Sequence, residues 1–427
     1  MKALRAPLVV LLCSALCIAQ VQVQSTFFGM CVNRISSFPA TVPIGSLRLW
    51  GTGTGWGHLC PTGPNCNWEH LDKWLAAAKA NGITDVMYTF GKVPAWIAAY
   101  PPSRPQTAEC QCFPPKDVTP DGGGSDEAWK GFVKALVEHN QRLDSNHAKI
   151  RYWGMWNEPS AKNFWQGTDS QLVRMAKDAY SIIKAADPAA LVLSPELGNN
   201  SREPTAAADY FDHYLAAGGG QYADVMAFHM SSLTVNPGGH PVVEDVVQQV
   251  TSMKKMMARH AEVASKPLWM TEGQWGRTDL ANWKDPNQEA SFVVRFYTLI
   301  ASLGVQRIYW YVYDPVGLEM GYGGLVGPDG TETAAAAGYK AVHKWLLGRT
   351  VSNCSLQGHV WSCDLTGPGY KGEVVWYDEY EKTTSYNAAG FASYQDIFGG
   401  VNPLDQKTHT ITLGNTPVLL ETSGKRP

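Results

Sequence analysis

Two glutamates each end an apolar run of the kind that forms a buried strand. Residues 151–159 read Arg-Tyr-Trp-Gly-Met-Trp-Asn-Glu-Pro and carry Glu158, and residues 267–273 read Pro-Leu-Trp-Met-Thr-Glu-Gly and carry Glu272. A carboxylic acid and a carboxylate on either side of one sugar are what cleavage of a glycosidic bond requires. One group protonates the leaving oxygen, and the other attacks or stabilises the anomeric carbon.

The surroundings of each glutamate bear on this interpretation. A lone glutamate is more often a helix cap. Nearby tryptophans, however, favour the protonated carboxyl group that a general acid needs. Asn157 can hydrogen-bond a sugar hydroxyl, and Trp275 can wall the pocket beside Glu272. Glu196, after another strand-like run, is the strongest competing carboxylate, and we expect it to have a minor role, such as substrate binding.

Both glutamates require a scaffold that brings distant strand ends together. Apolar runs typical of strands alternate with stretches of helical periodicity. The predicted strands are 27–32, 46–50, 84–90, 150–156, 190–194, 223–229, 267–271 and 306–313. The predicted helices are 68–80, 126–143, 170–186, 206–216, 242–260, 287–303 and 334–347. This alternation predicts an α/β fold, a (β/α)8 TIM barrel over residues 26–347, with its chemistry at the C-terminal ends of the strands.

Two further regions surround the predicted barrel. Beyond Gly348 helical periodicity disappears, and short β-rich runs separated by turns predict a small β-sandwich domain over residues 348–427. Strands from residues 20–45 are candidates to complete it. The stretch 101–125 has no periodicity, and we expect a loop that forms a wall of the substrate groove.

Composition and the N-terminus indicate an exported protein that binds sugars. Residues 1–19 have the charged start, apolar stretch and small-residue end of a signal peptide, and the apolar run is shorter than the roughly 20 residues that span a bilayer. The net charge of −3 gives no electrostatic argument for nucleic acid or an anionic membrane as a partner. The chain has 16 Trp and 18 Tyr, whose flat faces suit sugar rings, although most aromatic side chains serve the core.

Export makes the cysteines probable disulfides. Cys60 with Cys66, and Cys354 with Cys363, bracket short loops and are plausible pairs, whereas Cys110 and Cys112 are too close to bond comfortably. Seven cysteines remain beyond residue 19, so at least one thiol is left over. No Cys-x-x-Cys or His-Glu-x-x-His motif occurs, and we predict neither a metal site nor a cofactor.

Three segments resemble clan A glycoside hydrolases, and family 39 in particular. Trp156-Asn157-Glu158-Pro159 followed by Phe164-Trp165 resembles the acid/base segment. Residues 90–96, Phe-Gly-Lys-Val-Pro-Ala-Trp, are similar to the loop after the third strand, and Thr271-Glu272 is similar to the nucleophile segment. The likeness extends from about Phe28 to Leu347.

The resemblance implies a role for each matching residue. Glu158 would be the acid/base, Glu272 the nucleophile and Asn157 the partner of the sugar 2-hydroxyl, and Arg48 would orient the nucleophile. The other predicted substrate-binding residues are Trp50, Trp96, Trp165, His229, Trp275 and Trp310. Clan members often have a tyrosine two residues after the histidine of the sixth strand. Ser231 stands there in this chain, with Tyr311 or Tyr313 as candidate replacements.

We therefore expect a secreted, retaining glycoside hydrolase that acts on β-linked glycosides or polysaccharides by double displacement. Two alternatives stay open at this point: a non-catalytic carbohydrate-binding barrel, and a transglycosylase that uses the same residues. The sugar, the linkage and exo or endo action do not follow from the sequence.

Overall fold

Eight parallel strands form the centre of the molecule, in a computed structural model that describes residues 22–100, 112–198, 204–231, 235–236, 239, 241–276, 285–317, 323–405 and 407–422. The strands are β1 (Phe28–Cys31), β2 (Ser46–Leu49), β3 (Asp85–Thr89), β4 (Lys149–Gly154), β5 (Leu191–Leu193), β6 (Met226–Ser231), β7 (Leu268–Gln274) and β8 (Ile308–Trp310). They pair in the order β5-β4-β3-β2-β1-β8-β7-β6. Parallel bridges at Leu193–Val225 and Leu197–Phe228 join the two outer strand segments and close the sheet. The predicted TIM barrel is confirmed.

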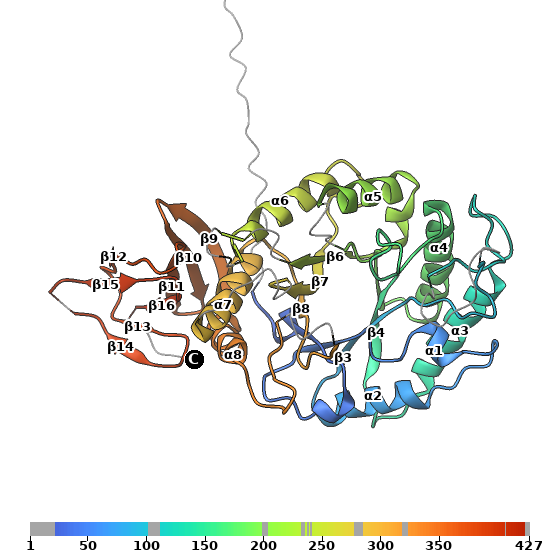
Figure 1. The fold of residues 1–427 in the computed structure, drawn as a ribbon, viewed down its shortest axis with the longest axis horizontal. Coiled ribbons are helices and arrows are strands. Elements are labelled where there is room, and N and C mark those ends of the chain that lie inside the picture. Colours follow the sequence, from blue (N-terminus) through green and yellow to red (C-terminus); the bar gives the residue numbers. More distant parts are fainter. Residues whose placement is uncertain are drawn as a thin grey trace, which may run out of the picture.

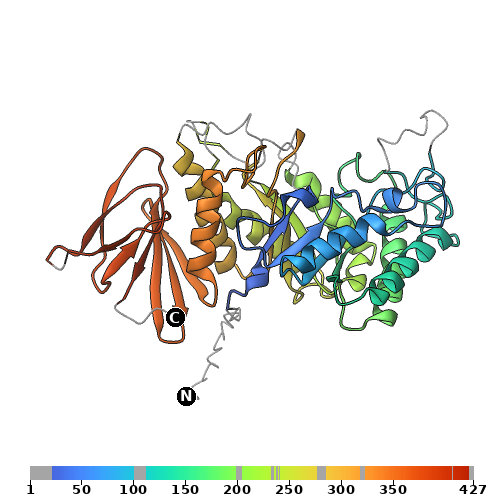
Figure 2. The same ribbon diagram turned by 90° about the horizontal axis from the view of Figure 1, so that it is seen from below.

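Helices follow the strands and cover the outside of the barrel (Figures 1 and 2). They are α1 (Trp56–Leu59), α2 (Glu69–Ala80), α3 (Glu127–Arg142), α4 (Asp169–Ala186), α5 (Pro204–Ala216), α6 (Asp245–Met257), α7 (Pro286–Ser302) and α8 (Ala334–Leu346). Their apolar faces are buried as the periodicity predicts, for example at Trp129, Phe132 and Leu136 of α3. The chain enters α4 through a capping box between Thr168 and Gln171, which satisfies backbone N–H groups at the helix start.

The eighth strand is shorter than predicted. The sequence suggests residues 306–313, but regular pairing ends at Trp310. The backbone continues to bond irregularly, because the amide of Tyr311 donates to Gly273 and that of Tyr313 donates to Cys31. The apolar run therefore extends beyond the strand into a segment held between β7 and β1.

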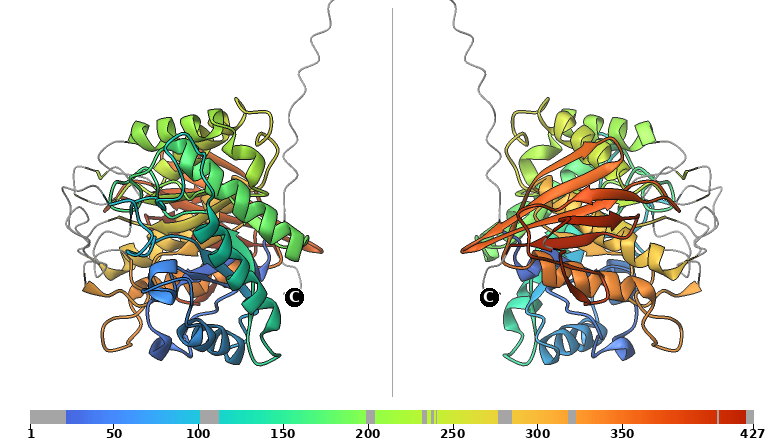
Figure 3. Two further views of the ribbon diagram at one scale, coloured as in Figure 1. Left: turned by 90° about the vertical axis from the view of Figure 1, so that its right-hand side faces the viewer. Right: turned by 90° about the vertical axis from the view of Figure 1, so that its left-hand side faces the viewer.

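The C-terminal region consists of antiparallel sheets beside α7 and α8 (Figures 1 and 3). Its strands are β9 (Thr350–Gln357), β10 (Val360–Gly367), β11 (Tyr370–Tyr377), β12 (Thr384–Asn387), β13 (Ser393–Gln395), β14 (Val401–Pro403), β15 (Thr410–Leu413) and β16 (Val418–Glu421). Six of them form one sheet, and β12 pairs with β15 in another. Polar contacts fix this region to the barrel: the Trp376 indole donates to Glu244 (2.9 Å), and Arg295 of α7 donates to Asn415 (2.8 Å).

Residues 22–45 do not complete the C-terminal sheets as suggested from the sequence. Their strand β1 pairs with β2 and β8 in the barrel instead. Only the segment around Val23 reaches the junction, where its backbone exchanges hydrogen bonds with Gly348 and Arg349. A fully buried pattern in Phe28–Cys31 is typical of a central barrel strand, which explains this placement.

Both predicted local disulfides are present, Cys60–Cys66 and Cys354–Cys363. Cys112 is also disulfide-bonded, and Cys110 lies outside the described residues, so the prediction for that pair has no test here. Cys31 is a buried free thiol, as the odd number of cysteines requires. The predicted signal segment 1–19 lies outside the described residues, and no helix within them is both long and apolar enough to cross a bilayer.

Candidate active site

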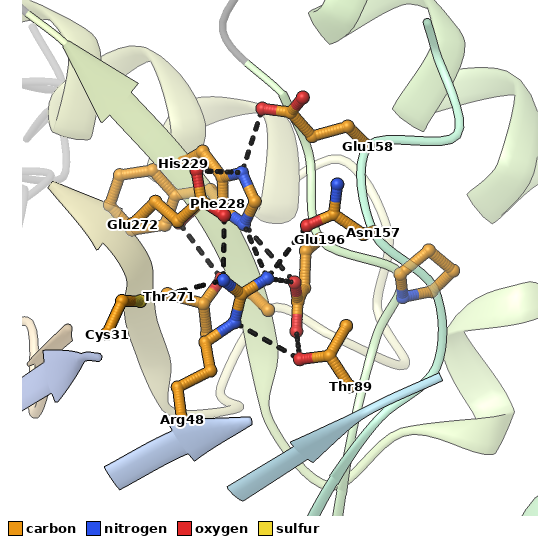
Figure 4. A network of polar contacts seen from close by, with 12 residues as sticks. Cys31, Arg48, Thr89, Asn157, Glu158, Glu196, Phe228, His229, Thr271 and Glu272 are labelled. Atoms are coloured by element: carbon orange, nitrogen blue, oxygen red, sulfur yellow. Dashed lines mark hydrogen bonds and ion pairs between the residues drawn. The ribbon is translucent and has the colours of Figure 1, made fainter. Parts of the chain in front are cut away.

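Charged and polar side chains meet at the C-terminal ends of the barrel strands (Figure 4). In a parallel barrel these ends surround one point, so residues distant in sequence become neighbours. The members are Arg48 of β2, Thr89 of β3, Asn157 and Glu158 after β4, Glu196 after β5, His229 of β6 and Glu272 of β7. The structure thus brings together five of the predicted site residues: Arg48, Asn157, Glu158, His229 and Glu272.

Arg48 lies at the centre of this cluster and is fully buried. Its Nη1 donates to Glu272 Oε1 (2.7 Å), and its Nη2 donates to Asn157 Oδ1 (2.8 Å). The same Nη2 forms an ion pair with Glu196. Burial acts to lower the pKa of Arg48, but the charges of Glu196 and Glu272 raise it well above its usual value, so the side chain stays cationic. The planar guanidinium can hold several acceptors at fixed angles, which an ammonium group cannot do.

His229 lies between three carboxyl groups. Its Nδ1 is 2.9 Å from Glu158 Oε1 and 3.4 Å from Glu272 Oε2, and its Nε2 is 3.2 Å from Glu196 Oε2. Burial acts to lower the pKa of His229, but the negative charge of Glu272 and hydrogen bonds to Glu158 and Glu196 raise it to about 9. The imidazole is therefore protonated at neutral pH and contributes a second positive charge.

The three carboxyl groups differ in their surroundings. Burial raises the pKa of Glu272, while the charges of His229 and Arg48 act in the opposite direction. Burial also acts to raise the pKa of Glu196, but Arg48 and His229 outweigh it and lower that pKa, so Glu196 is ionised. The Glu196 side chain is fully buried, whereas 25% of the Glu158 side chain is exposed. Glu158 is thus the carboxyl group most open to solvent and to an incoming ligand.

The backbone conformation at Glu158 fixes the direction of its side chain. Glu158 has φ 40°, a left-handed conformation that costs a non-glycine residue about 1–3 kcal/mol and is concentrated at functional sites. Its amide donates to the Glu196 carbonyl (2.9 Å), and the Glu196 amide donates to the Trp156 carbonyl (2.7 Å). A side chain at Gly198 would place Cβ 2.8 Å from the Glu158 carboxyl carbon, so a glycine there leaves the room that Glu158 occupies.

The five predicted tryptophans have different environments. Trp165, Trp275 and Trp310 are 1%, 4% and 0% exposed. Trp165 packs edge-on against Trp156, and Trp275 packs against Trp310, whose indole donates to the Gly323 carbonyl. These three rings therefore form the wall and core beneath the site and offer almost no free face to a sugar.

Trp50 and Trp96 are partly exposed. The Lys92 ammonium lies 5.6 Å from the Trp50 ring centre, and the Trp96 indole donates to the carbonyl of Cys60. Trp50 is the tryptophan best placed near the cluster, because the Arg48 guanidinium lies 6.0 Å from its ring. Substrate binding by any of the five stays a prediction.

Part of the loop expected to wall the substrate groove is described. Phe113, Lys116 and Val118 of this loop, together with Gln166 and Gln171, are among the residues that line a surface groove of about 430 Å³. The amide of Gln166 donates to the Cys112 carbonyl. Residues 101–111 lie outside the described part of the chain.

Other expectations concerned the surroundings of Glu272. Gly273, next to Glu272, faces the core: a Cβ there would meet Met270 and Phe296 at 2.9–3.0 Å. Tyr313, a candidate replacement for the tyrosine missing at Ser231, accepts a hydrogen bond from the Thr41 amide instead (2.9 Å). Within the described chain, Glu272 contacts Arg48 through Oε1 and His229 through Oε2.

A metal-binding interpretation of the cluster deserves a test, because Glu158, His229 and Glu272 each place one ligand atom within 4.8 Å of the others. The charges argue against it. A histidine binds metal through a deprotonated nitrogen, but both ring nitrogens of His229 already face carboxylate oxygens. The Arg48 guanidinium also lies against Glu272, where a cation would be repelled. We interpret the cluster as a carboxylate site whose acidic groups are paired with the protein's own cations, Arg48 and His229.

Sequence reasoning ranked Glu196 as a competitor with a minor role and did not consider Thr89. Thr89 Oγ1 accepts from Arg48 Nε (3.1 Å) and donates to Glu196 Oε1 (2.8 Å). Glu196 also occupies space left by Gly154, whose Cβ would collide with the Glu196 carboxylate. The available signal was the position of Thr89 at the C-terminal end of β3 and of Glu196 shortly after β5, which resembles the signal that identified Glu158.

Comparisons with known proteins agree with this architecture. No protein-family model matches the chain, and no curated protein matches its sequence. Among solved structures, a family 39 glycoside hydrolase from Bacteroides cellulosilyticus WH2 matches with TM-score 0.68 and 18% identity, over 94% of this chain and 82% of that one. A family 30 endoxylanase from Clostridium papyrosolvens C71 matches with TM-score 0.60 and 16% identity, over 94% and 97%. A family 44 xyloglucanase from Paenibacillus polymyxa matches with TM-score 0.58 and 13% identity, over 95% and 98%.

The chain has the fold of these glycoside hydrolases. At such low identity the similarity establishes the barrel and its appended sheets, and it does not transfer residue roles.

Proposed function

We propose that the protein is a retaining glycoside hydrolase in which Glu158 is the acid/base and Glu272 is the nucleophile. The observation that carries the proposal is the approach of these two carboxyl groups, whose facing oxygens lie within 4.8 Å of each other at the C-terminal end of the barrel. Retaining enzymes place the two groups about 5–5.5 Å apart, whereas inverting enzymes leave about 6.5–9.5 Å for a water molecule. The spacing supports double displacement.

The surroundings of each carboxyl group suit its proposed role. Glu272 has one oxygen bound by Arg48 and the other near His229, so two cations favour its ionised form and orient it for attack on the anomeric carbon. Glu158 is more exposed and can reach the leaving oxygen. In the first step Glu158 protonates that oxygen while Glu272 forms the glycosyl ester. In the second, Glu158 removes a proton from the water that releases the sugar.

Asn157 completes the proposed sugar contact. Its Oδ1 accepts from Arg48, so the side-chain amide is held with its NH2 group turned away from the guanidinium. That group can donate to the hydroxyl next to the anomeric carbon, where hydrogen bonds strengthen in the transition state. We propose β-linked glycosides or polysaccharides as substrates, with the barrel over residues 26–347 as the catalytic domain and residues 348–427 as the appended domain.

We also propose that the protein is exported. The disulfides Cys60–Cys66 and Cys354–Cys363 support this location, because such bonds persist in oxidising compartments. The composition of residues 1–19 supports it independently. Mass spectrometry of protein recovered from the medium would give the mature N-terminus.

The test begins with the purified protein and a panel of aryl glycosides and polysaccharides. NMR of the first-formed product should show the anomer of the substrate, and an inverted anomer would contradict double displacement. Glu272→Ala should lower kcat by several orders of magnitude while circular dichroism stays unchanged. Near-normal turnover in Glu272→Ala would show that another residue is the nucleophile, and Glu196 would be the next candidate.

The same panel separates the alternatives. Binding of a polysaccharide with no turnover of any glycoside would favour a carbohydrate-binding barrel. Products longer than the substrate, formed at high acceptor concentration, would favour a transglycosylase.

A further inference from the structure

Glu196 is a third carboxylate of the cluster to which double displacement assigns no step. It is fully buried, and it contacts both cations: it pairs with Arg48 and lies 3.2 Å from His229 Nε2. A buried carboxylate of this kind costs several kcal/mol unless it is paired, so its partners must stay charged or donate to it. Its second oxygen accepts from Thr89 (2.8 Å), which leaves the carboxylate little freedom to move toward a substrate.

This arrangement fixes the proton on one side of the His229 ring. Because Glu196 is ionised and can only accept, Nε2 must carry a proton directed at it. The other nitrogen, Nδ1, faces Glu158 Oε1 at 2.9 Å. Two states fit that contact. In one, an imidazolium Nδ1–H donates to ionised Glu158. In the other, a protonated Glu158 donates to a neutral Nδ1.

From these contacts we infer that Glu196 is a positioning residue that makes His229 and Glu158 a proton-sharing pair, so that His229 supplies the proton Glu158 gives to the leaving group. The inference rests on the proposed function, since it assigns the origin of the acid's proton. The charged groups that face His229 within the described chain are Arg48 on β2, Glu158 after β4, Glu196 after β5 and Glu272 on β7.

The proton balance of the two steps is simple. The Nδ1 proton passes to Glu158 Oε1, which gives a neutral imidazole and a carboxylic acid. Glu158 delivers that proton to the glycosidic oxygen as the C–O bond breaks and Glu272 bonds to the anomeric carbon. In the second step Glu158 takes a proton from the attacking water as the ester to Glu272 breaks, and the proton returns to Nδ1. Nε2 keeps its proton throughout because Glu196 holds it.

The first experiment is 15N NMR of histidine-labelled full-length protein, with the His229 signals assigned through His229→Gln. At pH 7 both ring nitrogens of His229 should show protonated shifts. In Glu196→Gln the side-chain carbonyl can still accept from Nε2, but the negative charge is gone. We therefore expect His229 to lose its proton at least one pH unit lower than in the wild type, the effect of one charge at this distance.

The second experiment is the pH profile of kcat/KM. The basic limb should move down with the His229 titration, so for a one-unit shift from about 9 the loss in Glu196→Gln should grow from almost none at pH 6 to about twofold at pH 8 and nearly tenfold at about pH 10. Asp85→Asn is the matched control. It removes a carboxylate at the opposite end of the barrel, where Asp85 pairs with Arg307, and should leave the basic limb in place.

Three outcomes would overturn the inference. A neutral His229 imidazole at pH 7 in the wild type would do so without any variant, which matters if Glu196→Gln fails to fold. An unmoved His229 titration, with activity lowered equally at every pH, would reduce Glu196 to a packing role. The same limb shift in Asp85→Asn would attribute it to the field of the whole protein. If the wild-type protein shows the expected NMR titration but turns over no glycoside, the proposed function would be wrong, whereas the protonation of His229 would stand.

Discussion

Removing the charge of Arg48 should destabilise the barrel and do so in a pH-dependent way. Arg48 forms ion pairs with both Glu196 and Glu272. Arg48→Met therefore leaves these two carboxylates buried, with the more distant His229 as their remaining cation in the described chain. Breaking a buried pair by removing one partner costs about 3–5 kcal/mol. We expect a loss of that size in the free energy of unfolding of the barrel at pH 8.

The sign of the pH dependence follows from the same contacts. Without Arg48, the folded-state pKa values of Glu196 and Glu272 rise, so the folded variant binds more protons than the folded wild type. The deficit should therefore shrink as the pH falls from 8 to 5, where the carboxyl groups become neutral. Urea unfolding followed by tryptophan fluorescence at several pH values measures this directly.

Two further variants sharpen the experiment. Arg48→Lys keeps a charge but loses the fork that binds Glu272 and Asn157 together, so its deficit should be smaller and its pH dependence weaker. Arg48→Met combined with Glu196→Gln removes both partners, and the double variant should recover about 0.5–3 kcal/mol relative to additivity. A deficit below about 1 kcal/mol at pH 8, or one independent of pH, would refute this view of the cluster.

Three other outcomes are expected. Glu158→Ala should lose far more activity on a natural glycoside than on an aryl glycoside with a good leaving group, and azide should restore aryl turnover; equal losses without rescue would exclude Glu158 as the acid/base. The folded-state pKa of His229, raised from 6.5 to about 9, should contribute about 3 kcal/mol of stability that is complete below pH 6.5 and lost as the pH rises through 9. In His229→Gln the free energy of unfolding, measured with urea, should depend less on pH across that window. Gly198→Ala places Cβ 2.8 Å from the Glu158 carboxyl carbon and should lower kcat at least tenfold with circular dichroism unchanged, whereas normal kcat would show that Glu158 can move freely.

Much of the barrel could be predicted because its signals are local. A buried parallel strand reads as a short apolar run, and the helices of a barrel read as long periodic stretches such as Glu127–Arg142. The sites at Glu158 and Glu272 followed from the same signal, since a polar residue directly after such a run must lie at the C-terminal face. The placement of β1 was less accessible. Its apolar run fits a strand of the barrel, where the sequence also places residues 27–32, but the run alone does not exclude pairing with the C-terminal sheets.

The roles of the tryptophans could not be predicted, for a physical reason. A ring that binds a sugar and a ring that fills the core use the same apolar surface, and only the three-dimensional surroundings separate Trp50 from Trp310. Glu196 was difficult for another reason. Its partners Arg48 and His229 lie on other strands, and sequence patterns do not record ion pairs across a barrel interior. The fold had to be known before Glu196 could be placed against both cations.

The balance of charge in the cluster connects these observations. Three carboxyl groups face Arg48 and protonated His229, so ionised carboxylates outnumber the cations by one, and the Nδ1 proton of His229 can pass to a carboxyl group without changing the net charge. Glu196 is a poor acceptor for that proton, because Arg48 and His229 lower its pKa. Burial raises the pKa of Glu272, but His229 Nδ1 lies closer to Glu158 Oε1 (2.9 Å) than to Glu272 Oε2 (3.4 Å). Glu158 contacts only His229 among the two cations and is the most exposed of the three. The Nδ1 proton of His229 is therefore best placed to be shared with Glu158, at the edge of the cluster that an incoming leaving group would meet first.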